Sequence, residues 1–195
     1  MRTSIPALAI CASIALPFSL PGESTGTCAN PFEAPALPEH EIAMTVRAGD
    51  VTIAGTDAPV LRVSCTLHDR GSANEVRISF AANHLTIRGG PDGNAHFRIE
   101  IPAKTNLLVR TSAGNLTVSG ITGDKDIELR AGNLTIEVGN AADYRRAGAF
   151  VLAGNLMAPA FGVGKDGLFR SFNKDNAAGR YRLHAEVLAG NLLLK

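Results

Sequence analysis

The stretch LRAGNLTIEVG, residues 129–139, contains the tetrapeptide that decides the fold of this chain. The same tetrapeptide, Ala-Gly-Asn-Leu, occurs four times in the 195 residues, beginning at Ala113, Ala131, Ala153 and Ala189. Short runs rich in Val, Ile, Leu and Thr flank the copies, and alternation of apolar and polar residues in such runs is typical of β-strands. The tetrapeptide therefore marks a recurring break between strands.

The apolar positions change parity at this break. They are odd-numbered before Gly132 and Asn133 and even-numbered after them. Glycine adopts positive φ without steric penalty, and asparagine tolerates left-handed geometry better than most residues. Apolar residues of both arms then face one core. This geometry fits a hairpin turn, and it equally fits a corner at which the chain bends and continues to the next coil of a repeat.

The spacing of the copies favours a corner. The four tetrapeptides are 18, 22 and 36 residues apart, and degenerate copies begin at Ala48 (AGDV) and Ala82 (ANHL). A near-constant period is the mark of repeat architectures, so we predict an all-β fold, a single β-solenoid or β-helix-like stack of about eight short coils. A β-sandwich meander is the alternative. The predicted corner residues are Gly49, Asp50, Gly114, Asn115, Gly132, Asn133, Gly154, Asn155, Gly190 and Asn191. Stacking would place Asn115, Asn133 and Asn155 in one column.

Composition limits the function classes. The chain is 45% hydrophobic, contains 20 glycines and carries a net charge of +1, so it is globular and gives no general case for nucleic-acid binding. The charge is uneven along the chain: residues 30–143 hold 10 Lys/Arg and 14 Asp/Glu, whereas residues 144–195 hold 8 and 3. A charge dipole along an elongated body suits docking end to end or onto an anionic polymer of the cell envelope.

The N-terminus is typical of an export signal. Arg2 precedes an apolar run over residues 5–20, which two prolines interrupt and which is too short to span a membrane well. We therefore expect a signal peptide over residues 1–29, a Pro-rich lead-in segment or cap over residues 30–41 and a β-repeat domain over residues 42–195. The mature chain is expected to lie outside the cytoplasm, in the periplasm, on the cell surface or secreted, without a transmembrane segment.

The cysteines leave three alternatives open. Cleavage before Cys28 allows a Cys28–Cys65 disulfide in an oxidising compartment, and cleavage after Ala29 leaves Cys65 alone. In the third alternative Cys28 is the lipid-bearing first residue of the mature chain.

Three stretches carry a family resemblance: VRAGDVTIAGTDAPVLRVSC (46–65), FRIEIPAKTNLLVRTSAGNLTVSGITG (97–123) and GRYRLHAEVLAGNLLLK (179–195). They resemble a bacterial family of exported β-repeat proteins of unknown function, labelled "putative adhesin", over roughly residues 41–195. The resemblance implies a β-solenoid at the envelope or cell surface, and it implies no defined activity. The chain departs from the family pattern at FGVGKDGLFRSFNKDN (161–176), where one corner is missing.

Residues with catalytic chemistry are scattered. The five histidines have no zinc-ligand spacing, and no nucleophile or phosphate-loop motif is present, so we expect no catalytic residue, no cofactor and no metal. The histidines are His40, His68, His84, His96 and His184. Carboxylates with possible glycan chemistry are Asp124, Asp126 and Glu128, on alternate positions of one strand, and Asp92 with Asn94 in a turn.

The least repetitive segment, residues 157–182, combines aromatic and basic side chains that suit a glycan or an anionic polymer. The candidate ligand surface consists of Phe161, Lys165, Phe169, Arg170, Phe172 and Arg180. A glycan site would need residues 124–128 and this segment on one face, with a groove between them.

The final run, VLAGNLLLK, ends the chain in a strand, so we expect self-association or partner binding at a C-terminal edge strand. These observations predict an exported, non-enzymatic β-solenoid with a structural, adhesive or scaffolding role at the bacterial envelope. The alternatives are a small glycan-binding or glycan-active β-helix and an envelope-stress sensory module.

Overall fold

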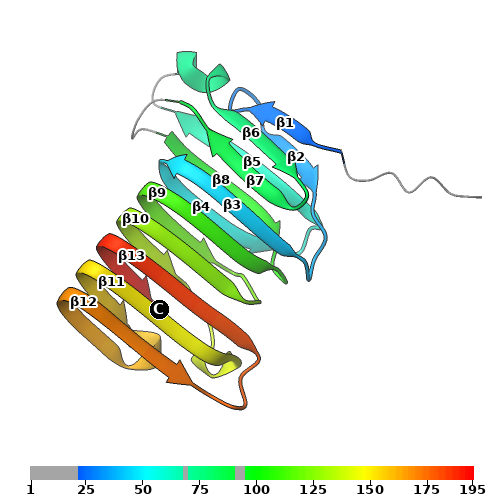
Figure 1. The fold of residues 1–195 in the computed structure, drawn as a ribbon. Helices are drawn as coiled ribbons and strands as arrows, with labels where there is room; N and C mark the ends of the chain where they lie inside the picture. Colours follow the sequence, from blue (N-terminus) through cyan, green and yellow to red (C-terminus); the bar gives the residue numbers. More distant parts are fainter. Residues whose placement is uncertain (1–21, 68–69, 91–94) are drawn as a thin grey trace, which may run out of the picture.

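The computed structural model describes residues 22–67, 70–90 and 95–195, and their secondary structure is almost entirely β (Figure 1). The predicted all-β class is confirmed. Most of the predicted signal peptide, together with His68, Asp92 and Asn94, lies outside the described residues. The strands are β1 (Ser24–Thr27), β2 (Phe32–Pro35), β3 (Glu41–Ala48), β4 (Asp50–Thr56), β5 (Val60–Leu67), β6 (Arg77–Ala81), β7 (His84–Arg88), β8 (Ala95–Pro102), β9 (Asn106–Ser119), β10 (Lys125–Ile136), β11 (Tyr144–Ala158), β12 (Val163–Asp175) and β13 (Tyr181–Leu194). Three short 3₁₀ turns are η1 (Arg70–Asn74), η2 (Ala141–Asp143) and η3 (Pro159–Phe161).

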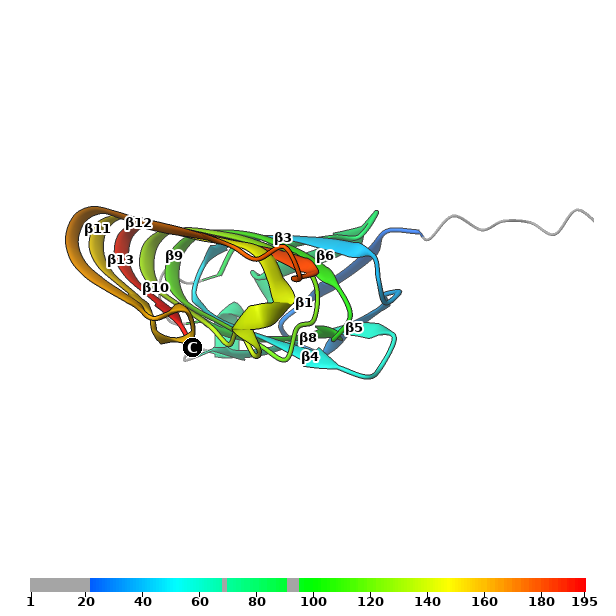
Figure 2. The same ribbon diagram turned by 90° about the horizontal axis from the view of Figure 1, so that it is seen from below.

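These strands belong to one 13-stranded sheet in the described part of the chain, with the main order β1-β6-β7-β3-β9-β10-β13-β11-β12. The long strands bend over at one edge, so that the sheet forms two facing layers (Figure 2). We call the layer of β3 and the first arms of β9, β10, β11 and β13 the first layer. The second layer contains their second arms, with β4, β8, β5 and β2 beyond them. The sheet is open and does not close into complete coils.

Parallel pairing dominates the centre of the sheet. It joins β3 to β9, β9 to β10, β10 to β13 and β13 to β11. A meander would make neighbouring strands antiparallel, because each hairpin reverses the chain. The parallel centre therefore argues against the β-sandwich meander.

The bend of each long strand lies at an Ala-Gly-Asn-Leu copy. Gly132 has φ +131°, and a Cβ at this position would overlap the main-chain oxygen of Gly114 on the neighbouring strand. Only glycine allows both the positive φ and this close approach of two backbones. On either side of the bend, odd-numbered Ile127 and Leu129 and even-numbered Leu134 and Ile136 are buried between the layers. Burial of each large apolar side chain stabilises the fold by about 1.5–3 kcal/mol.

Two findings correct the expected order of coils. β12 runs antiparallel to β11, and the last strand of the chain, β13, inserts between β10 and β11 and pairs with both. The predicted C-terminal edge strand is therefore wrong: β13 lies in the interior of the sheet, and β12 forms the edge at this end. The insertion satisfies the backbone groups of β13 on both sides and buries Leu183, Val187 and Leu192.

The other end of the sheet differs from the expected repeat. Ala82 and Asn83 have positive φ and form the two-residue turn of the antiparallel β6–β7 hairpin, so ANHL is a hairpin turn and not a corner. β1 pairs with β6, and β2, within the predicted lead-in segment, pairs with β5. A disulfide joins Cys28, just after β1, to Cys65 in β5. β1 and Cys28 lie within residues 1–29, and β2 lies within residues 30–41.

Candidate functional site: a charged groove across the long strands

The corner residues of five strands form a continuous row. Asp50, Asn115, Asn133, Asn191 and Asn155 occupy equivalent places on neighbouring strands. Side-chain Nδ2 atoms donate hydrogen bonds to the next Oδ1 along the row, from Asn191 to Asn133 (2.7 Å), from Asn133 to Asn115 (2.8 Å) and from Asn115 to Asp50 (2.8 Å). Asn191 lies between Asn133 and Asn155, because β13 is inserted there. The row links the bends and fixes the register of the strands.

One corner escaped the sequence reasoning. In β12, Gly167 pairs with Gly154 and has φ +111°, and Asp166 pairs with Asn155. Because β12 runs antiparallel to β11, its corner reads Asp-Gly-Leu in chain order, with Asp166 opposite Asn155 and Leu168 opposite Ala153. A bend is therefore present within residues 161–176, where the sequence pattern predicts that one corner is missing.

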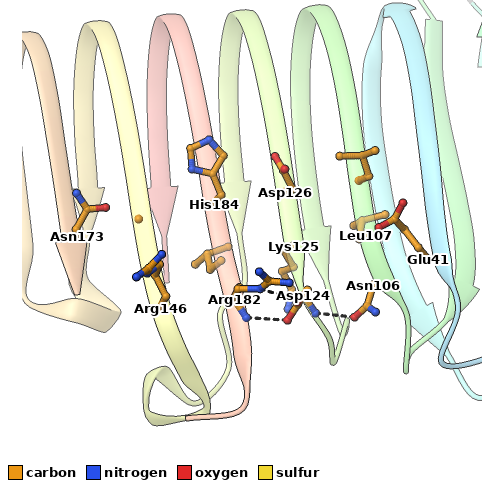
Figure 3. A pocket seen from close by; sticks show the side chains of 13 residues that line it. Glu41, Asn106, Leu107, Asp124, Lys125, Asp126, Arg146, Asn173, Arg182 and His184 are labelled. Carbon is orange, nitrogen blue, oxygen red and sulfur yellow. Dashed lines mark hydrogen bonds and ion pairs between the residues drawn. The ribbon is translucent and has the colours of Figure 1, made fainter. Parts of the chain in front are cut away.

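A groove of about 330 Å³ crosses the outer surface of the first layer (Figure 3). It spans six strands from β3 to β12, and its floor includes Gly148, which is buried and exposes no side chain above β11. Basic groups line the end nearest β11 and β12, and acidic groups line the β10 and β3 end. The polar lining residues that are not buried are Glu41, Asn106, Asp124, Asp126, Arg146, Asn173, Arg182 and His184, and the buried Lys125 also contributes to the lining.

Asp124 organises the centre of the groove. Its Oδ1 accepts a hydrogen bond from the Arg182 main-chain amide (2.8 Å), and its Oδ2 accepts one from Arg182 Nε (3.1 Å). The Asp124 amide donates to Oδ1 of Asn106 (3.0 Å). Three strands, β9, β10 and β13, are thereby tied together where they begin. The charge-assisted bonds hold the Arg182 guanidinium in place at the rim, where it remains exposed.

The other two predicted carboxylates share a second arginine. Arg110 on β9 donates from Nη1 to Asp126 (3.1 Å) and lies 3.1 Å through Nε from Glu128, both on β10. The ion pairs hold Arg110, Asp126 and Glu128 in fixed positions on the outer surface of β9 and β10. The groove can therefore hold a polar, extended ligand through ion pairs and amide hydrogen bonds.

The structure places residues 124–128 and part of the segment 157–182 on one face. Asp124 and Asp126 share the groove with Asn173 of β12, whereas the predicted aromatic residues do not line it. Phe161 and Phe172 are 7% and 8% exposed and pack against each other in the core, with ring centroids 5.5 Å apart. Phe169 is 69% exposed at the β12 corner.

The six residues of the predicted ligand surface therefore lie in different parts of the structure and do not form one surface. Lys165 and Arg170 lie on β12 with Phe169, near the bend. Arg180 lies in the loop before β13, with its guanidinium 5.8 Å from the Tyr181 ring. The segment thus supplies core residues, edge residues and a loop residue, and not a single surface.

A buried lysine lies beneath the groove and was not singled out from the sequence. Lys125 is 2% exposed and takes a core position between Leu107 and Leu183 on the neighbouring strands. Its Nζ donates to the Tyr144 hydroxyl (2.7 Å) and to the Gly123 carbonyl (3.2 Å). The alternation of inward-facing and outward-facing positions along β10 would have indicated that Lys125 is buried. Asp126 and Glu128 face outward, so Lys125 must face the core.

Burial shifts the titration of this pair. It lowers the pKa of Lys125 from 10.5 to about 8, against the opposing attraction of Asp124. Burial, followed by the charges of Asp143, Tyr181 and Asp124, raises the pKa of Tyr144 to about 12. Tyr144 also donates to the Val138 carbonyl (3.2 Å). These contacts give the Lys125 ammonium hydrogen-bond acceptors inside the fold.

The described histidines are distributed over separate surfaces. His84 bonds to Thr45, His96 lies 3.4 Å from Asp50, His40 bonds to the Pro38 carbonyl, and His184 lines the groove. Among residues 22–67, 70–90 and 95–195, no three His, Cys, Asp or Glu side chains converge as a metal site would require. Over the same residues, the structure contains no helix of the length and apolarity needed to cross a membrane.

Comparison with known proteins identifies a related fold. No protein-family model and no curated protein matches this sequence. Among solved structures, the chain is similar to a protein from Clostridium sporogenes ATCC 15579 described as a "putative cell adhesion protein". The TM-score is 0.50 and the identity 10%, over 85% of this chain and 98% of the other. At this identity the match concerns the fold alone, and no residue of the groove is transferred from it.

Proposed function

We propose that this chain is an exported, non-enzymatic β-solenoid-type module with an adhesive or scaffolding role at the bacterial cell envelope. The observation that carries the proposal is the stack of bends in register, joined by the hydrogen-bonded row from Asp50 to Asn191. Such a stack presents side chains on rigid outer faces, which suits the display of binding groups better than it suits a moving catalytic apparatus.

Two further observations support this role. The Cys28–Cys65 disulfide fits an oxidising compartment outside the cytoplasm. The acidic groups of residues 124–128 are each paired with Arg110 or Arg182, so they fit ligand binding better than acid–base catalysis. The adhesive description of the Clostridium protein belongs to that protein and adds a reason to test adhesion here.

The test is to express the full chain with a C-terminal tag in a bacterial host, fractionate the cells and determine the redox state of Cys28 and Cys65. The exported protein is then tested for retention on cell envelopes and on immobilised envelope glycans, with the soluble products analysed for cleavage. Export, an intact disulfide and retention without cleavage support the proposal. A reduced cytoplasmic protein, or release of shortened glycans, contradicts it.

Glycan binding in the groove is the second candidate, because Asp124, Asp126 and Asn173 line one groove together with Arg146 and His184. Amide, carboxylate and guanidinium groups in a row match the hydroxyl and acidic groups of an envelope polysaccharide. Asn173→Ala and His184→Ala should lower glycan affinity at least fivefold. Thr135→Ala on the outer surface of the second layer serves as the matched control. Equal binding by all three variants would remove the groove as the site.

A further inference from the structure

The two ends of the sheet are terminated differently. At one end lie β1 and β2, two strands of four residues each, and the Cys28–Cys65 disulfide holds the chain between them to β5. At the other end lies β12, which has 13 residues and pairs with β11 and with no other described strand. Short edge strands are protected against pairing with further chains, whereas a long open edge offers a template for another strand.

The free edge of β12 carries alternate unpaired backbone groups. The Asn176 amide donates to the Arg145 carbonyl (2.9 Å), so even-numbered residues at this end of β12 turn toward β11. In an antiparallel pair the N–H and C=O of one residue point to the same neighbour. Ser171, Asn173 and Asp175 therefore turn both groups to the free edge. Lys165 Nζ donates to the Ser171 carbonyl (2.7 Å), so a side chain already covers this edge acceptor.

The side chains near this edge include exposed apolar residues and basic residues that are not paired with carboxylates among the residues that the structure describes, whereas the arginines of the groove are paired with carboxylates. Leu168 and Phe169 are 61% and 69% exposed beside the bend. In the described part of the chain, no carboxylate lies within ion-pair distance of Lys165, Arg170 or Lys174, whereas the groove arginines are all paired. Arg170 Nε is buried without a hydrogen-bond partner.

The strands at this end of the sheet also carry a net positive charge. Residues 144–195, which hold 8 Lys/Arg and 3 Asp/Glu, form β11, β12 and β13, the three strands at this end (Figure 1). The uneven charge of the sequence is therefore concentrated at the open end of the sheet. A net positive end attracts an acidic partner and opposes the approach of a second copy through the same end.

We propose that β12 is a docking strand for an extended, acidic segment of a partner polypeptide, which adds to the sheet as a further antiparallel or parallel strand. The Ser171 amide and the backbone groups of Asn173 and Asp175 pair with the incoming chain. Its carboxylates meet Lys165, Arg170 and Lys174, and an apolar residue covers Leu168 and Phe169. A row of alternating donors and acceptors is matched by another polypeptide strand and not by a polysaccharide. The inference rests on the proposed scaffolding role and specifies where its partner attaches.

The test uses the full, disulfide-bonded chain and a fluorescent nine-residue peptide in which Glu or Asp alternates with Val and Phe. One control peptide replaces the acids with Lys, and another is N-methylated at alternate amides, which blocks strand pairing. We expect the acidic peptide to saturate in fluorescence anisotropy, with at least tenfold weaker binding by either control peptide and weaker binding at high salt.

Two variants locate the binding to the edge. Ser171→Pro removes a donor that faces the free edge and leaves the ladder to β11 intact, as proline is tolerated on the open side of an edge strand. The pair Lys165→Glu and Lys174→Glu reverses the charge without a change of backbone. Each should weaken peptide binding at least tenfold. Leu37→Ser is the matched control, because Leu37 is an exposed apolar residue just after β2, which belongs to the other end of the sheet, and it should leave binding unchanged.

Several outcomes overturn the inference. These are no binding of the acidic peptide, equal binding of the N-methylated peptide, or binding unaffected by the double charge reversal. Concentration-dependent dimers that Ser171→Pro abolishes would assign the edge to a second copy of the chain. Dextran sulfate binding that Ser171→Pro leaves unchanged, with no peptide binding, would assign the basic end to anionic polymers. Failure of peptide binding with retained envelope binding rejects this inference alone, and failure of both rejects the proposed function as well.

Discussion

Asn133 donates a side-chain hydrogen bond to Asn115 across two neighbouring strands, although the two residues are 18 positions apart in the chain. Asn133 in turn accepts the same bond from Asn191, which is 58 positions further on. One residue type at one place in each bend therefore joins strands that are distant in sequence. The relationship connects the repeated tetrapeptide to the register of the whole sheet.

Removal of the central asparagine should weaken the sheet. Asn133→Ala breaks two side-chain hydrogen bonds, so we expect the free energy of unfolding to fall by about 1–2 kcal/mol. Asn155→Ala is the control, because Asn155 occupies the same row without a bond to Asn191, and it should lower the free energy by less than half as much. Urea denaturation of the oxidised proteins measures both. Equal effects of the two substitutions would show that the hydrogen-bonded row contributes nothing specific.

A side chain at the bend should be far more damaging. Gly132→Ala places a Cβ against the Gly114 carbonyl and holds alanine at φ +131°, so we expect a loss of at least about 3 kcal/mol or failure to fold. Gly139→Ala is the control, since Gly139 also has positive φ but open space around it, and it should lose about 1 kcal/mol. Thermal and urea unfolding compare the two. A stable, natively folded Gly132→Ala protein would contradict the close approach of the bends.

The buried lysine gives the protein a pH dependence of known sign. The folded pKa of Lys125, about 8, lies below the unfolded value of 10.5. Below pH 8 the amine is protonated in both states. Between pH 8 and pH 10.5 the unfolded state binds more protons, so the free energy of unfolding rises with pH. We expect a gain of about 2 kcal/mol from pH 7 to pH 9.5. Above pH 10 the unfolded chain loses the Tyr144 proton first, because the folded pKa is about 12, and stability falls again.

Replacement of the lysine isolates its contribution. Lys125→Leu resembles Leu107 and Leu183 on the neighbouring strands, so it should raise the free energy of unfolding at pH 7 by about 1–2 kcal/mol and remove the rise toward pH 9.5. Lys104→Met, at an exposed position, is the control and should keep the rise. Urea denaturation at pH 7, 8.5 and 9.5 gives the comparison. A rise that persists in Lys125→Leu would assign the titration to another group.

The disulfide should stabilise the fold because it closes a loop and thereby restricts the unfolded chain. Cys28 and Cys65 are 37 residues apart, and closure of a loop of this length contributes up to roughly 4 kcal/mol by the chain-entropy model. The double variant Cys28→Ala and Cys65→Ala should therefore lose about 2–4 kcal/mol in urea denaturation. The wild-type protein in excess reductant is the matched control and should lose a similar amount. A reduced protein as stable as the oxidised one would show that the bond is not formed or not closed in the native fold.

Part of the fold followed from local sequence rules. The parity change across Gly132 and Asn133 predicted that both arms of a strand bury their apolar residues, as Leu129 and Leu134 do. The all-β class followed from the same alternation. These features depend on residues that are close together in the sequence, so a single sequence is enough to predict them.

The features that were missed depend on the direction in which each strand runs and on the order of the strands in the sheet. The bend at Asp166 and Gly167 was hidden because β12 runs in reverse, and the interior position of β13 was hidden because sequence order does not reveal insertion between β10 and β11. Ala82 and Asn83 matched the motif yet form a hairpin turn. Of the candidate site, Asp124 and Asp126 were singled out from the sequence. Of their partners, Arg182 falls in the predicted segment 157–182 but not among its candidate ligand residues, and Arg110 was not singled out; both come from other strands.

Amide hydrogen exchange measured by mass spectrometry on the intact, oxidised chain tests the central claim most directly, that β13 is inserted between β10 and β11 in a sheet whose open edge is β12. The account predicts that peptides over residues 183–193 exchange as slowly as those over residues 127–136, and that residues 168–175 exchange faster. Rapid exchange over residues 183–193, with slow exchange over residues 168–175, would place the last strand at the edge and contradict the account.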